Sequence, residues 1–524
     1  MDLASNNMVT ASWILILLYA AVTLFFVIRG ALKTKDIKDY AVGNISFPPF
    51  AVGLALSAAM TSAATFIINP GFIAYYGLSA IISYAIVLPI ASMVSLVFLT
   101  KGFRRHGSTV KAMTMAQWMG TRYNSKGYSL FFAFLSLLLI TFIVLIIIGL
   151  TKVMAHSLNV PETYMMAGLV IFIFGYMMFG GANSMVYTNT VQALLMLVVA
   201  VILLTSGHEH FANGVNGFLE KLRSIDPKLV QTTNESSFLF RDYFEIIFCQ
   251  IIIGIAIVCQ PHIITKSLLL KSDKGVNKYL FFAVITQIIF FWVVFTGIYA
   301  RFEFPDLMVN GVPLKLDNVI SAYVIKEFPV YMGLLVLLGL ISAGISTLEG
   351  LIQSIASTTT MDIVPTLFGK FLPKDEGKRN SRLILINRVS IFIFAIITII
   401  LSYDQLINPK LSVGIFAQNG VYAYFSAAFI PILIGMFFKN IPKLVPIIAS
   451  ATAVAVHFLY YYGKLGVPYS KATGENPGVA ATMAISASIL AAFITYFLTK
   501  KTNLVQSENN EKESRDKKDV QFSN

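Results

Sequence analysis

The sequence is poor in charge, has almost no cysteine and lacks the short motifs of ATP-driven or hydrolytic proteins. Asp, Glu, Lys and Arg make up only 12% of the 524 residues, about half their share in a soluble domain. The 2 cysteines, Cys249 and Cys259, would lie about 15 Å apart along one helix, too far for a disulfide. No Walker motif, Gly-rich phosphate loop or nucleophile elbow occurs, so the sequence supports neither ATP-driven transport nor an enzymatic activity.

Apolar residues take the place of the missing charge. They form 56% of the chain, and the mean hydropathy is +0.75. This composition predicts an all-α integral protein of the cell membrane, as in the bacterial inner membrane, with the lipid bilayer as its surroundings. The transmembrane domain is expected over residues 1–500, and the polar tail over 501–524 is expected to be disordered in the cytoplasm. About 13 spans are predicted, over residues 10–30, 47–76, 78–100, 127–154, 162–181, 188–207, 243–264, 279–300, 329–359, 383–402, 411–438, 442–462 and 478–499.

Positive charges predict the orientation of these spans. The first span has no Lys or Arg before it, whereas Arg29, Lys33, Lys35 and Lys38 follow it, the reverse of a cleaved signal peptide. With the N-terminus outside, the inner loops and the tail hold 28 of the 39 Lys and Arg residues, as the positive-inside rule requires. The bias predicts an odd number of spans, N-out and C-in. It also accounts for the net charge of +13 without a nucleic-acid partner.

Two spans contain helix-breaking residues at corresponding depths. Asn69-Pro70-Gly71 lies in the second span and Gln260-Pro261-His262 in the seventh, and the two spans run in opposite directions. Interrupted helices at matching places are typical of transporters built from an inverted repeat, here spans 2–6 and 7–11. Prolines are common in membrane helices, so a chance match is the alternative.

The ninth span carries an unusual stripe of small and hydroxyl-bearing residues. Hydroxyls inside an apolar segment need partners, because the bilayer offers no water. One interpretation is close packing of helices through small residues. The other is that Ser346 and Thr347 present oxygen ligands to a hard cation such as Na⁺. The residues on this face are Ala343, Ser346, Thr347, Gly350, Ser354, Ser357 and Thr358.

A second hydroxyl-rich patch lies in the middle of the second span, from Ser57 to Thr65. Small residues with side-chain oxygens tolerate local unwinding of a membrane helix. Unwinding frees backbone carbonyls, which are good ligands for hard cations. We therefore expect this patch to meet the hydroxyl stripe of the ninth span near the centre of the bilayer.

Five stretches of the chain, in order and at the right depth, resemble the sodium:solute symporter family. The similarity covers about residues 10–440 and is greatest to the pantothenate, monocarboxylate and proline branches. The five stretches are Ser62-Ala63-Ala64-Thr65-Phe66-Ile67 with Pro70-Gly71, Ile225 to Val230, Gln260-Pro261-His262-Ile263-Ile264 followed by Lys266, Ala343-Gly344-Ile345-Ser346-Thr347-Leu348-Glu349, and Phe425 to Lys439.

The resemblance implies a LeuT-type fold with a 5+5 inverted repeat and Na⁺-driven symport by alternating access. Na⁺ would be the coupling ion, and no organic cofactor is expected. Carried over position by position, the resemblance implies a sodium site of five neutral oxygens. Its ligands would be the carbonyls of Ala58, Thr61 and Ala343 and the hydroxyls of Ser346 and Thr347.

Two positions depart from the family pattern. Asn189, in Thr188-Asn189-Thr190-Val191-Gln192, stands where the family usually has an Asp. The missing acid favours one Na⁺ per cycle and puts any additional cation site in doubt. Met60 stands where proline symporters carry an Asp, which argues against simple identity with that branch.

Further polar residues within the spans are candidates for the ion path, for solute binding or for contacts between helices. Asn189 and Glu349 are placed along the ion path; Glu349 could instead pair with a neighbouring helix. The alternative for deep amides such as Gln260 and Gln418 is helix-to-helix bonding. His262 is interpreted as a helix-positioning donor rather than a proton carrier. The predicted solute-binding residues are Ser62, Thr65, Gln260 and Gln418.

The function predicted from these features is a secondary transporter that couples Na⁺ influx to uptake of a small organic solute. A carboxylate-bearing solute is favoured, such as pantothenate, a monocarboxylate or an amino acid like proline. Half-helix N-termini at a break would favour an anion. The alternatives are a Na⁺-coupled sugar or polyol symporter, and a non-coupled membrane sensor or channel. The oligomeric state is left open.

Overall fold

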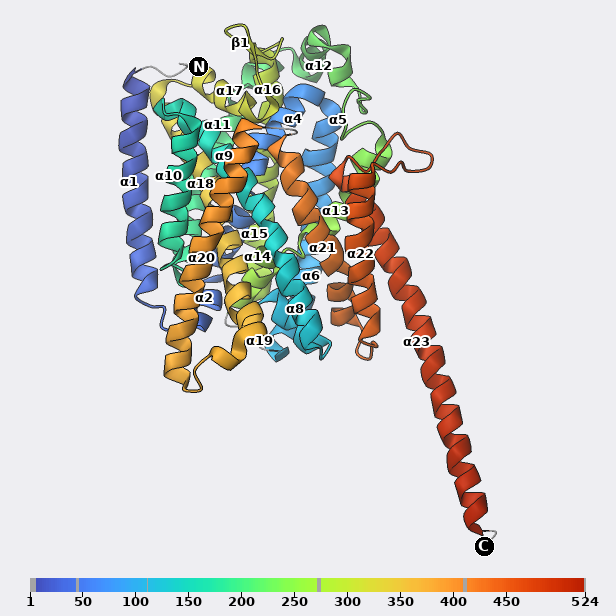
Figure 1. The fold of residues 1–524 in the computed structure, drawn as a ribbon. Helices are drawn as coiled ribbons and strands as arrows, with labels where there is room; N and C mark the ends of the chain where they lie inside the picture. Colours follow the sequence, from blue (N-terminus) through green and yellow to red (C-terminus); the bar gives the residue numbers. More distant parts are fainter. Residues whose placement is uncertain (1–5, 44–46, 111, 271–274, 409–411, 523–524) are drawn as a thin grey trace.

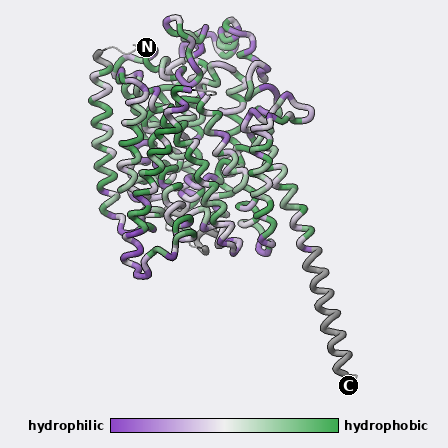
Figure 2. Tube along the Cα trace, in the orientation of Figure 1, coloured by the Kyte–Doolittle hydropathy of each residue, from purple (hydrophilic) through white to green (hydrophobic). Residues whose placement is uncertain are grey.

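The computed structural model describes residues 6–43, 47–110, 112–270, 275–408 and 412–522. The chain forms a bundle of long helices with one two-stranded hairpin (Figure 1). Among the described residues, 10 helices are long and apolar enough to cross a membrane, 2 bent helix pairs pass the same test, and a shorter apolar helix covers Glu162–Met177. Hydrophobic residues cover the middle of the bundle, and hydrophilic residues gather at both its ends (Figure 2).

The first half of the chain contains the first six predicted spans and the segment that follows them, from η4 to η5. Its elements are α1 (Asn6–Ala31), α2 (Ile37–Val42), α3 (Pro49–Met60), η1 (Ala64–Ile68), α4 (Asn69–Tyr76), α5 (Leu78–Ile81), η2 (Ile82–Val87), α6 (Leu88–Val110), α7 (Met115–Arg122), α8 (Lys126–Leu135), η3 (Ser136–Leu139), α9 (Ile140–Leu158), α10 (Glu162–Met177), α11 (Ala182–Thr205), η4 (His208–Phe211), α12 (Gly214–Ile225) and η5 (Pro227–Val230).

The second half contains the remaining spans and the hairpin. Its elements are η6 (Phe244–Cys249), α13 (Gln250–Ile257), α14 (Pro261–Ile264), η7 (Thr265–Leu269), α15 (Val276–Trp292), η9 (Val293–Phe295), α16 (Thr296–Glu303), β1 (Met308–Val309), β2 (Val312–Pro313), η10 (Leu316–Asn318), α17 (Val319–Glu327), α18 (Val330–Thr358), η11 (Thr359–Ile363), α19 (Val364–Phe368), η12 (Gly369–Phe371), α20 (Glu376–Ile407), α21 (Val413–Phe437), α22 (Leu444–Gly463) and α23 (Pro477–Phe522).

Each predicted span coincides with a helix, a run of consecutive helices or a bent pair. Helix α1 begins at one end of the bundle and α23 ends beyond the other (Figure 1). The transmembrane domain was predicted to start at residue 1. Its residues 1–5 lie outside the described residues.

The C-terminal tail follows the last span without a break in the helix. Helix α23 runs from Pro477 to Phe522 and projects away from the bundle (Figure 1). The tail contains Glu and Lys, which have high helix propensity, together with Asn and Ser, whose propensity is lower. Because the preceding span already supplies the nucleus, the tail needs only helix propagation, which costs less than nucleation.

The second span is broken, although not at its proline. Helix α3 ends at Met60, and the chain bends by 54° before the helical half that runs from Ala64 to Tyr76. The predicted breaker Asn69-Pro70-Gly71 instead lies inside the helical half from Ala64 to Tyr76, where the π-helical turn η1 joins α4. The break falls within the hydroxyl-rich patch from Ser57 to Thr65, where the sequence predicted local unwinding.

The seventh span is broken where the sequence predicted. Helix α13 ends at Ile257, and the chain bends by 55° before the half from Pro261 to Ser267. Pro261 begins α14, so its missing N–H falls where a helix has no internal acceptor. Gln260 precedes it in extended backbone, with φ −63° and ψ 136°.

One end of the bundle is capped by the β1–β2 hairpin and η10. Asp317 accepts a hydrogen bond of 2.9 Å from the Ser412 hydroxyl and lies 3.6 Å from the Lys152 ammonium. The Tyr75 hydroxyl donates to the Leu314 carbonyl at 2.5 Å. A Cβ at Gly71 would come within 2.1 Å of the Leu316 carbonyl oxygen, so only glycine permits this approach. The cap thus ties α4, α9 and α21 together.

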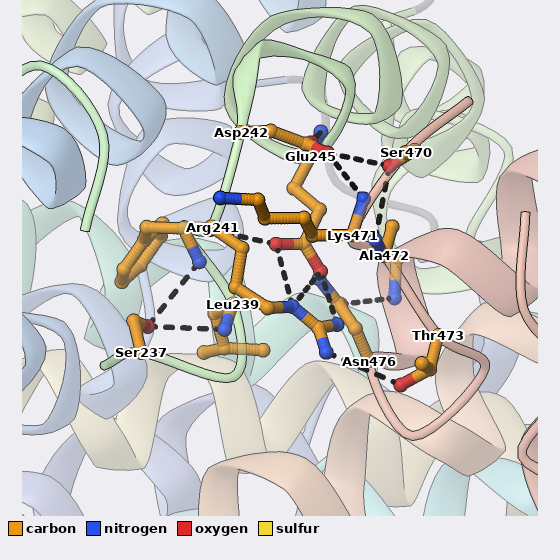
Figure 3. Close-up of polar contacts among 12 residues, drawn as sticks. Ser237, Leu239, Arg241, Asp242, Glu245, Ser470, Lys471, Ala472, Thr473 and Asn476 are labelled. Atoms are coloured by element: carbon orange, nitrogen blue, oxygen red, sulfur yellow. Dashed lines mark hydrogen bonds and ion pairs between the residues drawn. The ribbon is translucent and has the colours of Figure 1, made fainter. Parts of the chain in front are cut away.

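A polar clamp holds the loop between α22 and α23 against the start of the seventh span (Figure 3). The fully buried Glu245 carboxylate accepts from Arg241 Nη2 at 2.6 Å and from Asn476 Nδ2 at 3.0 Å. Asp242 accepts from the Ser470 hydroxyl at 2.6 Å and from a backbone N–H of the same loop at 2.9 Å. Partial burial raises the pKa of Asp242, but these hydrogen bonds outweigh it and leave the pKa below its ordinary value.

Candidate functional site

The hydroxyl stripe of α18 meets the broken end of α3. Ser346 Oγ donates to the Ala58 carbonyl at 2.8 Å and to the Ala343 carbonyl at 3.1 Å. Thr347 Oγ1 lies 3.1 Å from the Ala59 carbonyl and 3.4 Å from that of Ala58. All five residues are fully buried. Four of the five predicted sodium ligands therefore lie together, on two helices far apart in the sequence.

The physical cause of this meeting is the end of α3. The last carbonyls of a helix have no N–H four residues further on, so they need other donors. The break after Met60 frees those of Ala58 and Ala59, and the α18 hydroxyls reach them. Ala59 was not predicted; its position at a helix end is the signal that would have identified it.

Thr61, the fifth predicted ligand, caps the same helix end. Its N–H donates to the Ser57 carbonyl at 2.9 Å. Its hydroxyl is fully buried and has no hydrogen-bond partner within the described part of the chain. A buried hydroxyl without a partner is costly, and a bound cation would satisfy it. The residues thus offer only neutral oxygens, which suit a monovalent cation that must also be released.

A central cavity lies directly beyond the α3 break. The four predicted solute residues, Ser62, Thr65, Gln260 and Gln418, all line it. They come from η1, its preceding turn, the seventh-span break and α21. The side-chain oxygen of Gln260 is buried without a hydrogen-bond partner among the described residues. The other lining residues are Met60, Ala64, Ile68, Asn69, Tyr84, Leu88, Ser92, Phe142, Leu145, Ile257, His262, Ile263, Phe291, Gly414, Ala417, Val421 and Tyr422.

A second cavity lies on the other side of the seventh-span break. Its walls include Thr114, Lys266, Gln353 and Ser357, and it is lined also by His262. His262 is thus shared by the two cavities, and its ring centre lies 6.5 Å from that of Phe142. Among the described residues, His262 Nδ1 has no hydrogen-bond partner. No contact at this atom therefore supports the predicted role of His262 as a helix-positioning donor.

Glu349, one of two residues predicted along the ion path, bonds to neighbouring helices. Its Oε1 accepts from the Tyr176 hydroxyl of α10 at 2.7 Å, and its Oε2 accepts from the Thr188 hydroxyl of α11 at 2.7 Å. Glu349 is 1% exposed. Asn189, the other ion-path residue, is fully buried next to Thr188 on α11. Tyr176 and Thr188 were not predicted, because a single sequence does not indicate which helices become neighbours.

Comparison with known proteins identifies the family. Residues 40–443 match the sodium:solute symporter family, and this stretch contains both cavities and every predicted ligand. The chain belongs to the sodium:solute symporter family. Its homologues are membrane transporters, sodium/pantothenate symporters among them.

Three relatives of this symporter are informative. It is 26% identical to the sodium/pantothenate symporter of Haemophilus influenzae over 78% of this chain and 83% of the relative. It is 24% identical to the sodium/glucose cotransporter of Vibrio parahaemolyticus over 83% of this chain and 81% of the relative. Its fold is similar to that of a solved Na⁺-coupled sialic acid symporter, with a TM-score of 0.72 and 15% identity over 93% of this chain and 98% of the other.

Proposed function

We propose that the protein couples Na⁺ influx to uptake of a small organic solute that carries a carboxylate. One observation carries this proposal: the broken end of α3 belongs to both sites. The Ala58 and Ala59 carbonyls accept the α18 hydroxyls, while Met60 and Ser62, which directly follow, line the central cavity. An ion that fixes this turn also fixes the cavity wall. Binding of ion and solute would then be thermodynamically coupled, each raising the affinity for the other.

For the ion, we propose a single Na⁺ per cycle. Its ligands would be the carbonyls of Ala58, Thr61 and Ala343 and the hydroxyls of Ser346 and Thr347. The freed carbonyls of α3 and the α18 hydroxyls that reach them support a cation at this place. The amide at Asn189 supports the single stoichiometry, because a second site there would lack the family's carboxylate.

For the solute, we propose contacts with Ser62, Thr65, Gln260 and Gln418. The half-helix from Ala64 to Tyr76 starts at the cavity, so its N-terminal dipole would favour a carboxylate there. The apolar side chains of the cavity would contact the rest of the solute. Pantothenate, a monocarboxylate or an amino acid such as proline fits this description, and a pantothenate symporter is among the relatives.

A sugar or polyol is the second candidate solute. No Lys, Arg, Asp or Glu is among the described side chains that line the central cavity. Neutral hydroxyls and amides suit a sugar, which needs many hydrogen bonds and no counter-charge. A glucose cotransporter is also among the relatives.

The test is solute uptake into proteoliposomes that contain the purified protein. Labelled pantothenate, lactate, proline and glucose are offered with an inward Na⁺ gradient and, separately, with an equal K⁺ gradient. We expect one carboxylate to accumulate above its external concentration with Na⁺ alone. Accumulation of glucose would select the second candidate. Solute movement that reaches equilibrium equally fast with either cation would indicate an uncoupled channel and contradict the proposal.

We further propose thirteen spans in a 5+5 inverted repeat, spans 2–6 and 7–11, N-out and C-in. The symporter domain would cover residues 1–500, and residues 501–524 would form a cytoplasmic tail. The two bent pairs, each at the start of one repeat, support this arrangement. A single cysteine placed after Lys500, with the two native cysteines replaced, should react with a membrane-impermeant maleimide only after the cells are opened. Labelling in intact cells would contradict the orientation.

A further inference from the structure

A buried ammonium and a buried carboxylate face the same amide beside the proposed cation site. Lys266 Nζ donates to the Ala55 carbonyl at 2.9 Å. We assign the orientation of the Asn189 amide from its neighbours. Its oxygen then accepts from Lys266 Nζ at 3.0 Å, and its nitrogen donates to Glu349 Oε2 at 2.9 Å. Lys266 is 6% exposed and Glu349 1%. The amide thus bridges the two opposite charges.

This bridge lies close to the proposed ligands on both sides. Ala55 and Ala58 are one helical turn apart on α3, about 4.5 Å along the axis. Glu349 follows Thr347 by two residues on α18. The ammonium therefore lies within about two helical turns of the cation site. At that distance, in surroundings of low polarity, an unbalanced positive charge repels a second cation strongly.

Among the described side chains joined by this bridge, Glu349 is the one acid that can balance the charge of Lys266. A buried ammonium is costly unless an opposite charge compensates it. The other side chains that bond to the bridge, Tyr176, Thr188 and Gln192, are uncharged. Position 189 on α11 holds an amide, and the acid of this group of side chains is Glu349 on α18. Asn189 transmits its effect to Lys266.

We propose that Glu349 is the counter-charge of Lys266, and that this balance sets the affinity of the neighbouring site for Na⁺. Glu349 and Lys266 are positioning residues: neither is a ligand of the ion, and both act through the electrostatic potential at the site. The inference rests on the proposed Na⁺ site, and a wild-type protein without Na⁺ dependence would contradict that function first.

The experiment compares Na⁺ activation of uptake in variants that move or remove charge. Glu349→Gln leaves Lys266 unbalanced, so we expect the Na⁺ concentration for half-maximal uptake to rise about tenfold or more. Asn189→Asp with Glu349→Gln returns an acid to α11, beside Lys266. Lys266→Met with Glu349→Gln removes both charges. Both double variants should lie within about threefold of wild type.

Glu220→Gln on the exposed side of α12 makes the same change of charge at the surface and should leave Na⁺ activation unchanged. Thermal stability of each variant separates folding from affinity. If Glu349→Gln yields no folded protein, the double variants decide: folded protein with near wild-type Na⁺ activation supports the proposal. A wild-type response of Glu349→Gln, or double variants no better than Glu349→Gln, would overturn it.

Discussion

The two broken spans differ in the chemical groups that surround the break. At the second-span break, hydroxyls of α18 reach the freed carbonyls of Ala58 and Ala59, so the groups in direct contact are neutral. At the seventh-span break, the half that follows carries His262 and Lys266, and Lys266 Nζ extends back to the Ala55 carbonyl of α3. The first break thus supplies oxygens for a cation. The second supplies an amide to the cavity and a charge that must be balanced.

The largest expected effect concerns the anchoring of the seventh span at its clamped end. Glu245→Gln removes the carboxylate that pairs with Arg241 Nη2 at 2.6 Å. Because Glu245 is fully buried, the variant should lose about 3 kcal/mol of unfolding free energy. The measurement is thermal or denaturant unfolding in detergent. Glu475→Gln is the control, because its pair with Lys464 is largely exposed and should contribute less than about 1 kcal/mol.

The next prediction distinguishes the two breaks by the ligand proposed for each one, Na⁺ at the second-span break and the solute at the seventh-span break. Ser346→Ala and Thr347→Ala each remove one proposed Na⁺ ligand at the second-span break. Loss of a bond to a charged group costs about 1.5–3 kcal/mol, so apparent Na⁺ affinity should fall about tenfold to a hundredfold. Saturating Na⁺ should restore solute affinity, because the two bindings are linked.

The matched control is Ser342→Ala, one turn earlier on α18, where the hydroxyl donates to the Leu338 carbonyl at 2.8 Å. It should leave Na⁺ activation unchanged. If instead the stripe serves only helix packing, all three variants would lower thermal stability with Na⁺ dependence intact. That result would remove the distinction between the two breaks.

A smaller effect is expected from Gln260→Ala at the seventh-span break. One neutral hydrogen bond contributes about 0.5–1.5 kcal/mol, so the KM for solute should rise about twofold to tenfold. Na⁺ activation at saturating solute should stay near that of wild type. Gln250→Ala, on the same span but away from the cavity lining, is the control. An equal loss of solute and Na⁺ affinity would argue for the alternative, helix-to-helix bonding by Gln260.

The smallest expected effect is a response of the clamp to pH. The folded-state pKa of Asp242 is below its ordinary value. Its contribution is therefore fully present above the unfolded pKa and is lost as pH falls through the folded pKa. Limited proteolysis of the α22–α23 loop should become faster in that acidic range. Asp242→Asn should already be fast at neutral pH, and an unchanged cleavage rate across the range would show that the clamp does not depend on this carboxylate.

Much of this architecture could be predicted from the sequence, because membrane spans must be long and apolar. The hydroxyl stripe around Ser346 was likewise visible, since buried hydroxyls are conspicuous in such spans. The position of the second-span break was not set by Pro70, because the chain bends between Met60 and Ala64 and the helical half that follows includes Pro70. The partners of Lys266 and Glu349 were missed because they depend on which helices pack together.

The central claim is that the end of α3 and the stripe of α18 form a Na⁺ site. The most direct test is thermal unfolding of the purified protein in NaCl and in KCl, without solute. A ligand at about 100 times its Kd stabilises the folded state by about 2.7 kcal/mol. We predict a higher midpoint in NaCl for wild type and for Ser342→Ala, and no difference between the salts for Ser346→Ala with Thr347→Ala. An equal Na⁺-specific rise in that double variant would contradict the account.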